Sequence, residues 1–272
     1  MLSLTAGTVF LMWLGELITE KGIGNGISLF IFGGIVSGVP RELGTLYVLL
    51  KSGQTKWYNV IGLLAITLGT LIAVIWVTEG ERRVPVQYSK RVIGRKMMGG
   101  YSTHIPIRIN QAGVIPVIFA SSLLALPATL ATFIEAPWAK SLAAFFDYSQ
   151  PWYTVIYAAL IFAFTFFYTS MVFNPVDVAD NIRKYGGFIP GVRAGRPTAD
   201  MLGRIVNRIT FVGALFLALV AILPSFMMQL TGLPGFQALS GTAMLIVIGV
   251  ALETMKQIEA QLVMRHYDGF LK

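Results

Sequence analysis

Two long apolar stretches without charge constrain the fold of this chain more than any other feature. Trp57–Thr78 and Trp152–Phe173 contain no Asp, Glu, Lys or Arg, and each reaches the length of about 20 residues that an α-helix needs to cross hydrocarbon. Inside a bilayer the backbone must satisfy its polar groups internally, which a helix does. The two stretches therefore predict transmembrane helices, and the aromatic rings of Trp57 and Trp152 at their edges are typical of a membrane interface.

The rest of the chain repeats this pattern. Hydrophobic residues make up 55% of the sequence and charged residues only 12%, so the chain is more apolar than a soluble domain of its size. We expect an all-α fold, a polytopic transmembrane helix bundle of about seven spans with the first one shortened. The second span is short unless it continues through Pro40 to Leu50. The expected spans lie near Leu2–Leu17, Ile27–Val39, Trp57–Thr78, Ala112–Phe133, Trp152–Phe173, Ile209–Leu230 and Leu239–Met255.

Two polar segments interrupt the apolar pattern and carry most of the positive charge. If the spans alternate in direction, all but four of the 21 Lys and Arg residues fall on one side of the membrane. The positive-inside rule assigns that side to the cytoplasm. The expected layout is three spans in 1–78, a basic cytoplasmic loop in 79–110, two spans in 111–173, a second basic loop in 174–208, two spans in 209–256 and a cytoplasmic tail in 257–272. Simple connectors do not need such long basic loops, so we expect them to dock a large partner.

Local backbone signals divide the loops further. Asn174 followed by Pro175 predicts the end of one helix and the start of a short one, with Asp177 near its N-terminus. The glycines and proline of Tyr185–Gly195 exclude a regular helix and predict a shaped loop that presents Arg193. In the first loop, the alternation of Val84, Val86 and Tyr88 permits a short strand or hairpin. Within the second span, Gly33, Gly34 and Gly38 are expected to allow close packing of helices.

Catalysis is poorly supported by the sequence. The chain has no cysteine, and its two histidines, His104 and His266, have no metal-ligand spacing. No ionisable residue lies deep within a long span, where ion-coupled transporters place one. We therefore expect neither an enzyme nor a bound cofactor or metal. A small-molecule secondary transporter of the inner membrane stays open as the alternative, since it would share the spans and the charge bias. A purely structural assembly subunit also stays open.

Three long segments resemble one known family. They are MWLGELITEKGIGNGISLFIF (Met12–Phe32), INQAGVIPVIFASSLLALPAT (Ile109–Thr129) and FFYTSMVFNPVDVADNIRKYGGFIPGVRAG (Phe166–Gly195). The chain resembles the SecY family, the channel subunits of the bacterial protein translocase, over essentially its whole length. The resemblance implies that the chain begins within the fourth of ten spans and runs through the tenth. A missing N-terminal portion of the same subunit would then hold the first three spans, the plug segment and one wall of the lateral gate.

The resemblance also implies roles for residues inside the spans. Ile31, Ile118 and Ile246 would belong to a ring of apolar side chains that closes the pore, although each is otherwise simply an isoleucine in a span. Residues 111–173 would form part of the lateral gate. Ser121, Ser122 and Thr129 would place hydroxyl groups at that gate, while hydroxyls in spans more often bond to the backbone of their own helix.

The basic loops would bind the partners. The resemblance implies that Arg193 docks the motor ATPase SecA or the ribosome, and that Arg91, Arg95, Lys96 and Arg196 assist it. The plain alternative is that these residues only orient the protein in the membrane and bind no partner. Other implied partners are the small subunits SecE and SecG, a signal-sequence-bearing polypeptide and membrane lipids. The expected function is passage of unfolded polypeptides across the bacterial cytoplasmic (inner) membrane, with release of hydrophobic segments sideways into lipid.

Overall fold

The computed structural model describes residues 2–53, 56–88, 91–93, 96–98, 102–131, 145–146, 150–231 and 241–270. Helices dominate these residues, which confirms the expected helical bundle. Five of the helical segments are long and apolar enough to cross a membrane: Leu2–Lys21, Gly26–Lys51, Trp57–Glu79, Pro151–Lys184 and Arg196–Leu223. The chain divides into two compact units, Met1–Ile75 with Leu223–Lys272, and Trp76–Ile222.

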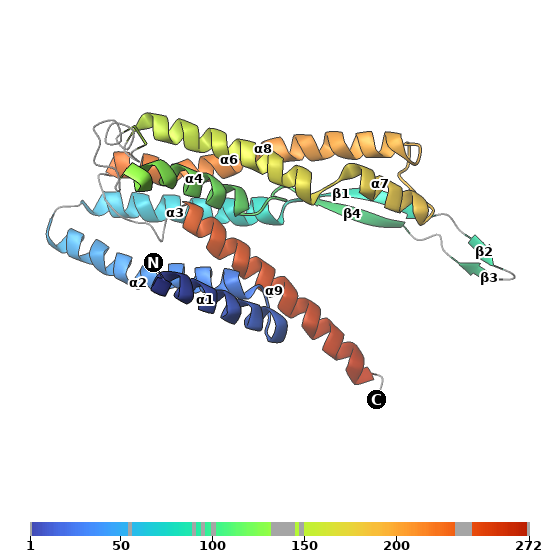
Figure 1. The fold of residues 1–272 in the computed structure, drawn as a ribbon, viewed down its shortest axis with the longest axis horizontal. Helices are drawn as coiled ribbons and strands as arrows, with labels where there is room; N and C mark the ends of the chain where they lie inside the picture. Colours follow the sequence, from blue (N-terminus) through green and yellow to red (C-terminus); the bar gives the residue numbers. More distant parts are fainter. Residues whose placement is uncertain are drawn as a thin grey trace. The chain divides into compact units, whose positions relative to one another are not determined.

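The first unit contains α1 (Leu2–Lys21), α2 (Gly26–Lys51), most of α3 (Trp57–Glu79) and α9 (Gly241–Phe270) (Figure 1). Helix α2 does continue through Pro40, which confirms the longer form of the second span. Asn25 caps it, because its side-chain oxygen accepts hydrogen bonds from the backbone N–H groups of Ile27 and Ser28 at 3.1 and 3.3 Å.

The closest packing of α1 on α2 lies at their turn. A side chain at Gly26 would overlap the carbonyl group of Gly15, so only glycine fits there. At Gly33 and Gly34, by contrast, an added methyl group would meet no atom within 4 Å. Within the described part of the chain Gly33 and Gly34 therefore make no close helix contact, and the contact of α2 with α1 lies at Gly26, about two turns earlier on α2. Close packing at the two later glycines stays a prediction.

The second unit contains two helical segments long and apolar enough to cross a membrane, a shorter apolar helix and a small sheet. Its helices are α4 (Ile115–Ala131), α6 (Pro151–Val172), α7 (Pro175–Lys184) and the larger part of α8 (Arg196–Thr231). Its three-stranded sheet has the order β4–β1–β5, with β1 at Glu81–Tyr88, β4 at Ser102–Arg108 and β5 at Gly187–Phe188. Strands β2 (Arg91–Ile93) and β3 (Lys96–Met98) form a separate antiparallel pair. The alternation in the first loop thus predicted a real strand.

The two polar loops fold together into one body. Strand β1 pairs antiparallel with β4 from its own loop and with β5 from the second loop, where Gln87 lies opposite Phe188. Helix α7 and the first part of α8 cover one face of this sheet (Figure 1). We call this assembly of β1, β4, β5, α7 and the first part of α8 the loop subdomain.

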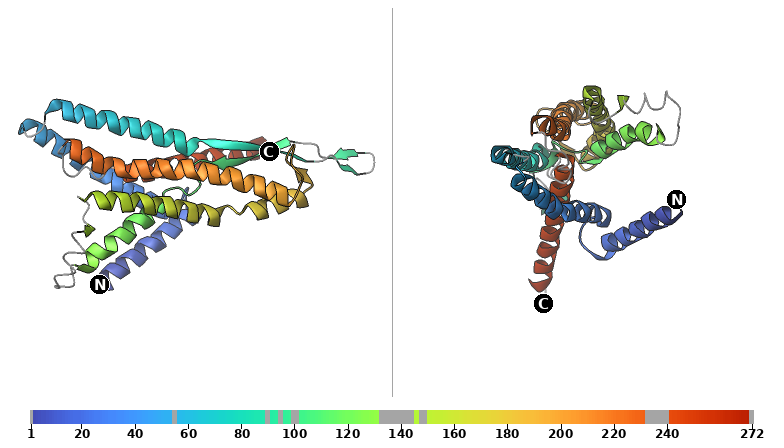
Figure 2. Two further views of the ribbon diagram at one scale, coloured as in Figure 1. Left: turned by 90° about the horizontal axis from the view of Figure 1, so that it is seen from above. Right: turned by 90° about the vertical axis from the view of Figure 1, so that its left-hand side faces the viewer.

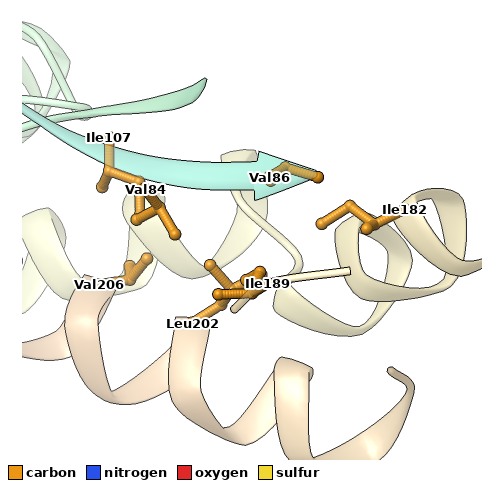
Figure 3. Packing of buried hydrophobic residues seen from close by; sticks show 7 residues of the cluster. All are labelled: Val84, Val86, Ile107, Ile182, Ile189, Leu202 and Val206. Carbon is orange, nitrogen blue, oxygen red and sulfur yellow. The ribbon is translucent and has the colours of Figure 1, made fainter. Parts of the chain in front are cut away.

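A hydrophobic core holds the loop subdomain together. Figure 3 shows its side chains pointing toward one another from the sheet, from α7 and from α8. Loop residue Ile189 is 2% exposed at the centre of this group, and Leu202 of α8 is fully buried. The core consists of Val84, Val86, Ile107, Ile182, Ile189, Leu202 and Val206. Because these residues come from both loops, neither loop can form this structure alone.

Helix α8 is longer than a membrane requires. Its 36 residues correspond to about 54 Å at 1.5 Å per residue, against a hydrocarbon core of about 30 Å. The left view of Figure 2 shows it as one continuous helix. Its outward residues change character after Arg208, from exposed Arg204 and Arg208 to exposed Phe211 and Leu215. The helix therefore begins at Arg196, ahead of the expected span at Ile209–Leu230, and its polar first part belongs to the loop subdomain.

Candidate docking surface and pore helices

The loop that carries Arg193 is anchored on both sides. Before it, buried Gly187 pairs with Tyr88 of β1, and Ile189 inserts into the core of the loop subdomain. A tight turn follows, in which the backbone N–H of Val192 donates to the carbonyl of Ile189 at 3.1 Å. Backbone and core contacts thus fix the approach to Arg193.

The backbone after Arg193 is fixed as well. The hydroxyl of Thr198, a residue that is only 1% exposed, donates to the Arg193 carbonyl at 2.8 Å. Gly195 has φ of +106° and its carbonyl accepts from the N–H groups of Thr198 and Ala199 at 3.0 and 3.2 Å, which starts α8. The side chain of Arg193 is exposed while its backbone is held, so the loop presents a cation from a rigid frame.

Further cations lie at the same end of the loop subdomain. Arg183 lies in the last turn of α7, and its Nη1 atom would be 3.8 Å from a methyl group placed at Gly195, so the end of α7 meets the start of α8. Arg183 has an exposed ion pair with Asp180 at 3.6 Å. Among the residues that the structure describes, Arg193 and Arg196 form no ion pair. We call this group the α7–α8 surface; it consists of Arg183, Lys184, Arg193 and Arg196.

The other predicted docking residues belong to the first loop. Arg91 lies in β2 opposite Met98, and Lys96 lies in β3 opposite Ile93. The placement of their side chains is not part of the described structure, and Arg95 lies outside the described residues altogether. The structure therefore groups Arg193 with Arg196, and the contribution of these three residues of the first loop stays a prediction.

The predicted pore isoleucines all lie on apolar helices. Ile31 on α2 and Ile118 on α4 are each 42% exposed, and Ile246 on α9 is partly buried. Ile31 and Ile246 belong to the first compact unit, in which α2 contacts α9, and Ile118 belongs to the second. The exposure of Ile31 and Ile118 is compatible with side chains that line a passage or pack against a helix outside this chain. Their assembly into a ring stays a prediction.

The predicted gate hydroxyls are bonded within their own helix. Ser121 and Ser122 both donate to the carbonyl of Ile118, at 2.9 and 2.8 Å, and Thr129 donates to the carbonyl of Ala125 at 2.7 Å. These bonds match the alternative in which a hydroxyl satisfies itself on the local backbone. Helix α4 packs on α6, where the rings of Phe119 and Phe164 lie 6.0 Å apart. The role of the three hydroxyls at a gate stays a prediction.

Sequence reasoning missed the residues that support Arg193. Thr198 and Ile189 have no charge and no motif chemistry of their own, yet they hold the Arg193 backbone. The available signal was the spacing of Thr198 three residues after Gly195 at a helix start. No group of three or more His, Asp or Glu side chains in the described part of the chain is placed to hold a metal ion.

Comparison with known proteins gives consistent matches along the chain. A family model described as SecY matches residues 1–255. Proteins named protein translocase subunit SecY from Halalkalibacterium halodurans and Bacillus subtilis are 50% and 47% identical to it over 278 and 280 residues. These alignments cover 100% of this chain and 65% and 64% of the two relatives. The chain thus spans just under two thirds of the length of the curated relatives that it matches.

A solved structure reported as "The structure of a protein conducting channel" has the same fold. Its TM-score is 0.63 at 21% sequence identity, and the alignment covers 94% of this chain and 63% of that one. With five helical segments suited to crossing a bilayer and bacterial relatives of this kind, the chain is a multi-pass protein of the bacterial cytoplasmic membrane. From the match of the family model and the identity to these relatives, the chain belongs to the SecY family.

Proposed function

We propose that this chain supplies helices and docking loops to the channel subunit of the bacterial protein translocase. That subunit passes unfolded polypeptides across the cytoplasmic membrane and releases hydrophobic segments sideways into lipid. The observation that carries the proposal is the combination of membrane-type helices with Arg193, an exposed cation on an anchored backbone, in a chain of the SecY family. It is a transport role, and the chemistry that powers transport belongs to a partner.

A water-accessible path is what a translocated chain needs. Each charged side chain costs about 2.5–3.5 kcal/mol or more at the centre of a bilayer, so an unfolded polypeptide cannot cross the lipid directly. An open aqueous path would leak ions. A constriction of aliphatic side chains can dewet and still yield around a passing chain. We assign Ile31, Ile118 and Ile246 to that constriction, in keeping with their apolar character and with the exposure of the first two.

Helix α4 is the proposed moving wall of a sideways exit. Its contact with α6 is supported by the aromatic pair of Phe119 and Phe164. The hydroxyls of Ser121, Ser122 and Thr129 are satisfied within α4, so this face can meet lipid without an unpaired donor. A hydrophobic segment that leaves between α4 and a facing helix would therefore meet a surface already adapted to an apolar solvent.

The α7–α8 surface is the proposed docking site for cytosolic partners. The guanidinium of Arg193 pairs well with carboxylate or phosphate through its fork of donors, and its rigid backbone reduces the entropy lost on binding. The partners that we propose are the motor ATPase SecA and the ribosome, with SecE and SecG as small membrane subunits. The hairpin with Arg91, Arg95 and Lys96 would add a second contact.

Charge reversal at Arg193 tests this docking role. In membrane vesicles that carry the complete translocase, we expect Arg193→Glu to insert normally and to block motor-driven export of a protease-protected substrate. Arg82→Glu is the matched control, since Arg82 is exposed in β1 and close to the membrane end of α3, and it receives the same change of two charge units. Normal export by Arg193→Glu, at native levels of the complex, would show that this residue does not dock the motor.

A further inference from the structure

Exposed aromatic rings outside the membrane-type segments call for an explanation. Tyr185 is 77% exposed and Phe188 is 39% exposed, and both lie in the loop subdomain. In a helix that crosses a membrane, lipid or a neighbouring helix covers exposed apolar residues such as Leu219 of α8, which is 60% exposed. That explanation does not extend to a loop beyond the end of α7. We infer that Tyr185 and Phe188 are the aromatic anchors through which the α7–α8 surface grips an acidic protein partner. The inference deepens the docking role proposed above and rests on it.

The backbone holds both rings in place. Tyr185 ends α7, where its N–H donates to the Asn181 carbonyl at 3.1 Å, and the next N–H, of Gly186, donates to Arg183 at 3.0 Å. Phe188 lies in β5 opposite Gln87, and its neighbours Gly187 and Ile189 are buried. Rings carried on a fixed backbone lose little freedom when they bind, which favours their use as anchors.

The charges around the rings match a protein interface. Tyr185 directly follows Arg183 and Lys184, and Phe188 lies five residues before Arg193 in the same anchored loop. Tyrosine and arginine are enriched among the residues that dominate binding energy at protein interfaces. Carboxylates are the complementary groups for the exposed arginines, so the partner face must be acidic with an apolar centre.

The sheet edge favours a protein over a nucleic acid. In the order β4–β1–β5, strand β5 is the last one, so no other strand covers the outer edge of Phe188 in the described part of the chain. A protein backbone can bond to such an edge while its side chains cover the ring. An RNA partner would use the arginines for its phosphates and the rings for base stacking, but it would leave the backbone groups of this strand edge unpaired.

Binding to purified partners tests the anchors. The complete translocase in nanodiscs is titrated with purified SecA and, separately, with empty ribosomes. We expect Tyr185→Ala and Phe188→Ala to weaken SecA binding at least tenfold and to leave ribosome binding within twofold. Tyr185→Phe keeps the ring and should bind like the native protein. Val176→Ala is the matched control, because Val176 is 57% exposed at the other end of α7.

Salt dependence separates anchoring by a ring from pairing by a charge. Tyr185→Ala should lower affinity at every salt concentration with an unchanged slope, whereas Arg193→Glu should also flatten the slope. Native SecA affinity of both alanine variants alongside loss in Arg193→Glu would overturn the anchors and leave the docking role standing. Selective loss of ribosomes by Tyr185→Ala would overturn the choice of a protein partner. Native binding by Arg193→Glu would instead refute the docking role itself.

Discussion

Truncation of Ile189 is the sharpest test of how the Arg193 loop is held. Ile189 is 2% exposed and contacts a core built from both loops. Ile189→Ala removes three carbon groups, which cost about 0.8 kcal/mol each in lost burial, and the remaining cavity adds to this. The expected loss is about 3 kcal/mol of local stability, inside the usual range of about 2–5 kcal/mol for such a change.

Hydrogen exchange of the complete translocase reads this loss directly. If amides 187–195 exchange when this core opens, a loss of about 3 kcal/mol in the free energy of opening makes their exchange roughly 150-fold faster. Amides of α6 in the same molecule should exchange at their native rate. Val176→Ala is the control, since Val176 is exposed on α7 and outside the core. Native exchange at 187–195 in Ile189→Ala would refute the idea that the core holds this loop.

Two further predictions concern the loop backbone and the pore. Gly195→Ala should destabilise the start of α8 by about 1–3 kcal/mol, because φ of +106° strains any residue with a β-carbon; the same exchange experiment measures it, and an unchanged rate at 193–199 would contradict it. Ile118→Asn should raise the resting ion conductance of the translocase in planar bilayers, because a polar side chain keeps a constriction wet. Conductance equal to that of the native complex would remove Ile118 from the seal.

The spans were predictable because membrane solvation acts locally. The stretch Trp57–Thr78 became α3 (Trp57–Glu79), and Trp152–Phe173 became α6 (Pro151–Val172). The start of α7 also depends on neighbouring residues. Asn174 precedes Pro175, and its side-chain oxygen accepts a hydrogen bond from the N–H of Val176 at 3.1 Å. In each case neighbouring residues decide the outcome, so a single sequence carries the signal.

The loop subdomain was not predictable from local signals. The alternation of Val84 and Val86 indicated a strand, but nothing near them indicated that β1 also pairs with Phe188 from the other loop. Hydropathy placed the start of the α8 span at Ile209, since the earlier turns are polar on their outer face. These turns form an amphipathic helix. Its buried face carries Leu202 and Val206, which are four residues apart.

Cross-linking from a single cysteine tests the proposed path most directly. The chain has no cysteine, so Ile118→Cys gives one defined thiol in this chain. Leu219→Cys, at an exposed apolar residue of α8, gives the control. With a secretory polypeptide arrested midway through the complete translocase, the account predicts an adduct from residue 118 to that polypeptide and none from residue 219. If residue 118 gives no adduct, or if both residues give adducts of equal strength, the substrate does not pass along α4.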